Sequence, residues 1–93
     1  MDEEQLEAMR EHLALLVNEG KPENQFWEPD LDIEQAFMCL DAMGTLFNIS
    51  GEPGFDNFNC WIEDGEEGAV ADGCKTLPLA ICIAACRATG MEI

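Results

Sequence analysis

Basic residues are nearly absent from this sequence. Its 93 residues include 4 lysines and arginines against 20 aspartates and glutamates, which gives a formal net charge of -16 and a pI near 4.1. A surface with this charge repels phosphate groups, so we expect neither direct nucleic-acid binding nor adsorption to an anionic membrane. Because independently folding domains usually have about 100–150 residues, a second domain is not expected. The hydrophobic fraction of 47% favours one folded domain over residues 1–93.

Residues for common catalytic chemistry are also scarce. His12 is the single histidine, and nucleophilic catalysis needs a nucleophile with a base in hydrogen-bond reach. At about 100° per residue, His12 falls at the border of an apolar helical arc, which favours a half-exposed surface residue. Glycine-rich phosphate loops are absent. We therefore expect no enzymatic activity and no cofactor, and leave a hydrolase or nucleotide-binding site without a recognisable motif as the least favoured alternative.

Cys-x-x-Cys pairs are missing, and the 5 cysteines are an odd number. This pattern fits neither a disulfide scaffold nor a common zinc motif, so no metal site is expected, although weak divalent binding by acidic clusters stays open. The N-terminal residues lack the basic and apolar parts of a secretory signal, which predicts a cytoplasmic protein. We expect free, mostly buried thiols at all five positions: Cys39, Cys60, Cys74, Cys82 and Cys86.

No apolar run is long enough to cross a membrane. The longest uncharged stretch runs from Thr76 to Cys86, and a membrane span needs about 20 residues. Within it, residues 77–85 predict a helix that is apolar on every side, and such a helix is buried or lies in a contact. Thr76 is the expected N-cap.

The remaining periodicity predicts two more helices and three strands. Helices are expected over 3–19 and from Ile33 to Met43. Asp2 with Gln5 forms an acidic capping box for the first; Asp30 or Asp32 can cap the second, and Asp32 with Gln35 again makes the capping box. Alternating residues predict strands over 45–50, 58–63 and 69–72. The order α-α-β-β-β-α indicates an α+β fold in which helices cover a small antiparallel three-stranded sheet. We expect Phe26 and Trp27 to fix the first interhelical connection on the core.

Several of these segments resemble the phage ABA-sandwich domain, a family of small phage and prophage proteins. The resemblance is carried by Trp27-Glu-Pro29, Asp32-Ile33, Ala36, Trp61, the stretch Leu77-Pro-Leu-Ala-Ile-Cys-Ile-Ala-Ala85, Ala88 and Gly90. It covers about residues 26–91 and implies a phage origin and a fold of helices over a small sheet, without a catalytic motif to transfer. Residues 1–25 lie outside the resemblance, so we interpret the acidic first helix as an addition to a 26–93 core.

The first helix has two contrasting sides. Glu4, Glu7 and Glu11 fall within about 60° of one another, and we take them, together with Asp64, Glu66 and Glu67, as candidate partner-binding residues. An apolar stripe at spacings of three and four lies opposite and predicts self-association as a homodimer, unless it packs on its own sheet: Leu6, Met9, Leu13 and Leu16.

A dense acidic surface can present a DNA-like array of charge to a basic site. The leading hypothesis is a non-enzymatic phage inhibitor of a host defence complex, of the anti-CRISPR type. Its partner would be a host protein or ribonucleoprotein with a basic nucleic-acid-binding surface. The alternative is a phage accessory or structural protein that acts by self-association, with the acids serving solubility.

Overall fold

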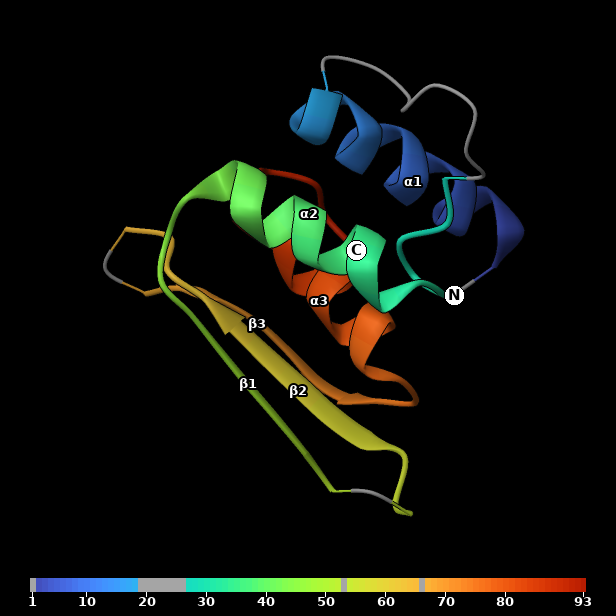
Figure 1. The fold of residues 1–93 in the computed structure, drawn as a ribbon, viewed down its shortest axis with the longest axis vertical. Helices are drawn as coiled ribbons and strands as arrows, with labels where there is room; N and C mark the ends of the chain where they lie inside the picture. Colours follow the sequence, from blue (N-terminus) through green and yellow to red (C-terminus); the bar gives the residue numbers. More distant parts are fainter. Residues whose placement is uncertain (1, 19–26, 53, 66) are drawn as a thin grey trace.

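A computed structural model describes residues 2–18, 27–52, 54–65 and 67–93. Its elements follow the predicted order α-α-β-β-β-α. They are α1 (Glu3–Asn18), α2 (Ile33–Met43), β1 (Phe47–Glu52), β2 (Asn57–Ile62), β3 (Ala69–Cys74) and α3 (Leu77–Ala88). The predicted α+β fold is confirmed, and Figure 1 shows the helices on one side of the sheet. No helix in the described part of the chain is long and apolar enough to span a membrane.

Local sequence signals set the helix ends. At the start of α1, Gln5 N donates to Asp2 Oδ1 (2.9 Å) and Asp2 N donates to Gln5 Oε1 (3.2 Å), as a capping box requires. Asp32 caps α2, but the side chain of Gln35 instead accepts from Glu28 N at 2.7 Å, so the second capping box is only half formed. Gly44 ends α2 in the left-handed conformation, with φ 64°.

The central helix is α3, which lies between the sheet and the other two helices (Figure 1). One side packs on β2 and β3, and the other packs on α1 and α2. This position explains why the helix is apolar all round. Small side chains allow the close approach on both sides, and its buried residues are Ala80, Ile81, Cys82, Ala84, Ala85 and Cys86.

The sheet has the strand order β1-β2-β3, with both pairs antiparallel. Cys60 and Ile62 of β2 and Ala71 of β3 face the helices and are buried. The opposite face carries polar residues and the half-buried Trp61, and no described segment covers it. The helix-facing side of β1 is also only partly covered, because α3 packs on the other two strands.

The expectation for Phe26 and Trp27 can be compared in part with this structure. Trp27 is 8% exposed and donates from Nε1 to the carbonyl oxygen of Arg10 at 2.6 Å, so it does fix its segment on α1. Phe26, the other residue of the expected pair, lies outside the described residues.

Candidate functional site

The predicted acidic residues are exposed, but they do not form one surface. Glu4, Glu7 and Glu11 lie on α1, at one end of the molecule. Asp64 and Glu67 lie in the connection between β2 and β3, which Figure 1 shows on the side of the molecule away from α1. Glu66 lies outside the described residues. The structure therefore separates the two candidate clusters.

The exposed acids have little basic compensation. Within the described residues, the ion pairs are those of Arg10, with Asp30 at 2.7 Å and with Glu28 at 3.7 Å. Arg87 is bound to carbonyl oxygens instead, those of Ile93 (2.9 Å) and Val70 (2.7 Å). Because so few of the described acids are paired with a base, the described surface keeps a strongly negative electrostatic field in the folded state.

The apolar stripe of α1 packs on the helices of its own chain. Met9 and Leu13 are 0% exposed and belong to the core that α1 shares with α2 and α3. Leu6 and Leu16 are partly buried against the same core. The stripe therefore packs inside its own chain, with Met9 and Leu13 fully covered, and self-association through the partly buried Leu6 and Leu16 stays a prediction. The same packing makes α1 an integral part of the single core.

The thiols are free, as expected, and all five are buried. Burial raises the pKa of Cys39 and Cys86 to about 12 and that of Cys60 to about 11. Burial likewise raises the pKa of Cys74 and Cys82 above the ordinary value. Because the thiolate is the reactive form, burial lowers the reactivity of these cysteines at neutral pH. No cluster of three or more metal-ligating side chains occurs among the described residues.

His12 joins α1 to the end of α3. Its Nε2 lies 2.6 Å from Thr89 Oγ1, and that hydroxyl lies 2.7 Å from the carbonyl oxygen of Ala85. A threonine hydroxyl has one proton to donate. When that proton goes to the Ala85 carbonyl, the ring N–H of His12 donates to Thr89 Oγ1. This histidine is thus held in a structural contact between two helices.

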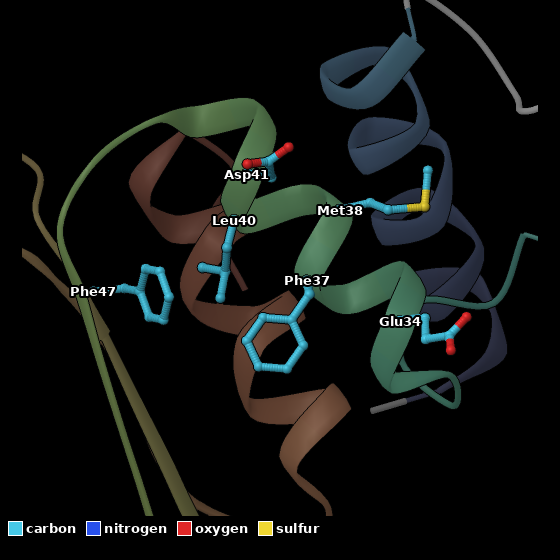
Figure 2. Close-up of a pocket in the computed structure, with 6 residues that line it drawn as sticks. All are labelled: Glu34, Phe37, Met38, Leu40, Asp41 and Phe47. Carbon is cyan, nitrogen blue, oxygen red and sulfur yellow. The ribbon is translucent and has the colours of Figure 1, made fainter.

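A groove between α2 and β1 is the feature that sequence reasoning missed. Its volume is about 400 Å³, and we call it the α2–β1 groove; it is lined by Glu34, Phe37, Met38, Leu40, Asp41 and Phe47. Figure 2 shows Phe37 and Leu40 of α2 and Phe47 of β1 pointing into the same space. The rings of Phe37 and Phe47 are 6.5 Å apart at 62°, an edge-to-face arrangement.

This groove combines an apolar floor with acidic residues on its α2 side. Phe37 and Phe47 are 41% and 44% exposed, although the sequence pattern assigns both to the buried sides of their elements. Glu34 and Asp41 are exposed lining residues on α2, and Figure 2 shows them on the same face of the helix as Met38, with their carboxylates directed away from Phe47. One sign of the groove was present in the sequence: α2 has more apolar residues than a single buried stripe can hold. Phe37 and Met38 are neighbours that point about 100° apart, so they cannot both lie on that stripe.

Comparison with known proteins supports the fold. No protein-family model matches the chain, and no curated protein matches it. A phage protein from Bacillus cereus, known from a crystal structure, has a similar fold with a TM-score of 0.68 and 12% sequence identity. The match covers 86% of this chain and 87% of that one, more than residues 26–93 could supply, so the shared fold includes part of residues 1–25. The chain therefore has the fold of a phage protein.

Proposed function

We propose that this protein is a non-enzymatic phage inhibitor that binds a basic, nucleic-acid-binding surface of a host defence complex. An anti-CRISPR protein is the most concrete form of the proposal, and the host cytoplasm is where it would act. The fold shared with a phage protein supports the phage origin. Membership of the phage ABA-sandwich family is part of the same proposal.

The observation that carries the proposal is the uncompensated acidic surface. Of the acidic residues that the structure describes, all except Glu28 and Asp30 are exposed, and the ion pairs described involve Arg10 alone. Solubility does not require this density, because a net charge of magnitude about 2–8 is enough for a small domain. A charge of -16 is well beyond that range. Attraction to a basic partner is a function that would use the negative charge beyond what solubility needs.

The absence of catalysis is part of this proposal. The raised pKa values keep the thiols protonated at neutral pH, and the single histidine is bound to Thr89. Self-association, the alternative role, is less well supported, because Met9 and Leu13 of the expected seam are buried in their own core. Two copies would also have to bring together surfaces of like charge.

The test is retention of a defence complex on the immobilised protein. Lysate from a bacterium with an active CRISPR system is applied, and we expect a nucleic-acid-binding complex to be retained and released between about 50 and 500 mM NaCl. Double-stranded DNA should compete for that complex. A variant with Glu4→Lys, Glu7→Lys and Glu11→Lys should retain less, and the matched Glu→Gln variant should be intermediate.

Two results would contradict the proposal. One is a retained complex that is indifferent to salt, to DNA and to the charge reversals, which would assign recognition to apolar contacts. The other is full immunity of the host when the protein is expressed during infection, because an inhibitor should restore phage growth.

A further inference from the structure

The two edges of the sheet are protected to different degrees. At β3, the register shifts opposite Phe58 and Cys60, and Gly73 adopts φ 66°, so a β-bulge interrupts the strand. Arg87 also donates to the Val70 carbonyl at 2.7 Å. Bulges and covering side chains are the usual means by which proteins prevent unwanted strand pairing at an edge. The β3 edge has both.

The β1 edge has neither of these devices. Five of its six residues are exposed, and residues 47–52 contain neither proline nor lysine. Glu63 N donates to Leu46 O at 2.8 Å, so by the alternation of an antiparallel ladder Phe47, Ile49 and Gly51 direct their N–H and C=O groups away from β2. β1 is an edge strand, because the described sheet has the order β1-β2-β3. These backbone groups are therefore open to another strand.

The α2–β1 groove lies on the same side as the side chains of these residues. In a sheet, residues directly opposite each other place their side chains on the same face. A strand added beside β1 would therefore direct the side chain opposite Phe47 toward the space that Phe37 and Leu40 line (Figure 2). Backbone pairing and a side-chain pocket are the two parts of recognition by strand addition.

Charge identifies the occupant. Glu34 and Asp41 are seven residues apart on one side of α2, and both line the groove on its α2 side. Basic side chains on either side of an apolar one would be attracted to these carboxylates. A second copy of this chain would instead bring another charge of -16 to the same edge. The rim therefore favours a basic segment and disfavours a copy of the protein itself.

We infer that β1 and the α2–β1 groove form a docking site for an extended, basic segment of a partner protein, which pairs with β1 as a fourth strand and inserts one apolar side chain beside Phe47. This inference rests on the proposed function, because it names the kind of partner segment that the acidic protein recognises. Charge alone would attract a basic partner to the whole acidic surface. The docking site adds a defined position on the protein and backbone hydrogen bonds to β1.

The test uses a blocked peptide of sequence Arg-Thr-Arg-Thr-Leu-Thr-Arg-Thr-Arg. Its leucine and arginines would face the groove, and its threonines would face the polar side of the sheet. The control peptide is N-methylated at the leucine and the two nearest arginines, so it keeps its charge but cannot pair with β1. We expect the control to bind at least tenfold more weakly. Amide NMR shifts should centre on Phe47, Ile49 and Gly51 and leave β3 unchanged.

Two protein variants of equal net charge separate the groove from the general acidic field. Glu34→Lys with Asp41→Lys should weaken binding of the unmodified peptide at least tenfold. Glu4→Lys with Glu7→Lys changes the net charge by the same amount on α1 and should weaken it less than threefold. Circular dichroism of both variants checks that they fold. The comparison of the two peptides on the unmodified protein does not depend on any variant.

The outcomes distinguish this inference from the proposed function. Equal binding of both peptides, with equal effects of the two double variants, would overturn the docking site. Binding would then be explained by general attraction to the acidic surface, as in the proposed function. Failure of both peptides to bind at low salt would overturn both. A doubling of mass in solution with NMR shifts at β1 would show that a second copy occupies the edge, which also overturns the inference.

Discussion

Arg10 binds the buried carboxylate of Asp30 with two parallel hydrogen bonds, from Nε to Oδ1 at 2.7 Å and from Nη2 to Oδ2 at 3.0 Å. The hydrogen bond to Asp30 raises the pKa of Arg10 above its ordinary value. The same residue accepts the Trp27 indole N–H at its carbonyl oxygen. Arg10 therefore fixes the segment before α2 to α1 through both its side chain and its backbone.

Replacing this arginine should destabilise the fold. Arg10→Met leaves the carboxylate of Asp30, 3% exposed, without its charged partner. We expect the free energy of unfolding to fall by about 2 kcal/mol, below the range for a fully buried pair because the Arg10 side chain is 28% exposed. Urea unfolding measures it. Lys75→Met, at an exposed position, is the control and should change stability by less than about 0.5 kcal/mol. Equal effects would refute the role of the pair.

The elements could be predicted because their signals are local. The capping box at Asp2 and the glycine stop at Gly44 act on neighbouring backbone groups, so the sequence shows them directly. The use of the α1 stripe could not be predicted, because residues such as Met9 and Leu13 have the same spacing in a dimer seam as in a core. Tertiary packing decides between the two.

The α2–β1 groove was missed for a different reason. Alternation places Phe47 on the helix-facing side of β1, and that much is correct. Whether a helix covers it depends on where α3 lies, and α3 packs over β2 and β3. A single helix, about 10 Å wide, cannot cover three strands spaced about 4.8 Å apart together with their side chains. Which strand stays uncovered is set by the whole fold.

Two leucines of α1 test the position of the apolar stripe. Leu13 is 0% exposed and Leu15 is 64% exposed on the same helix. Leu13→Ala should lower the free energy of unfolding by about 2–4 kcal/mol through the cavity it leaves, and Leu15→Ala by less than about 0.5 kcal/mol. Neither effect should depend on protein concentration. If the loss at Leu13 grows on dilution, the stripe serves an interface between copies after all.

Alkaline pH should unfold this protein through its cysteines. Burial raises the pKa of Cys60 to about 11 and that of Cys39 and Cys86 to about 12, against about 8.5 in an unfolded chain. The stabilisation is complete below about pH 8.5. It is lost as pH rises toward 11–12, because only the unfolded state releases these protons.

Each such thiol lowers the free energy of unfolding by up to about 1.4 kcal/mol per pH unit in that window. Urea unfolding at several pH values from 8 to 11 measures the slope, and the absence of tyrosine removes one competing titration. In Cys39→Ala, the fall in the free energy of unfolding per pH unit should be smaller by the contribution of about one thiol. A flat profile up to pH 11 would show that the thiols ionise in the folded state.

Gly68 should resist substitution more strongly than Gly65. Both have positive φ, 78° and 67°, so alanine is strained at either position. A Cβ at Gly68 would also collide with the Trp61 indole, and a Cβ at Gly65 meets nothing within 4 Å. Gly65→Ala should cost about 1 kcal/mol, and Gly68→Ala clearly more, with a shift in tryptophan emission. Equal costs without an emission shift would mean that Trp61 does not rest on this glycine.

Glu7→Lys should separate stability from binding. Glu7 lies four residues from both Glu3 and Glu11 on α1, so lysine there replaces two like-charge pairs with two attractive ones. Each exchange is worth a few tenths of a kcal/mol, and it also relieves the self-repulsion of a chain with charge -16. The melting temperature should therefore rise, most at low salt, with Glu7→Gln intermediate.

If the acidic surface is the working part of the protein, the same substitution weakens binding to a basic partner while the fold gains stability. Parallel melting and binding measurements at about 20 and 200 mM NaCl test both effects, because salt at the higher concentration screens exposed charges beyond about 7 Å. A variant that is more stable and binds as well as the original would show that Glu7 is only a solvated surface residue with no part in partner binding. A variant that is more stable and binds less would show that this helix keeps unfavourable charge for the sake of its partner.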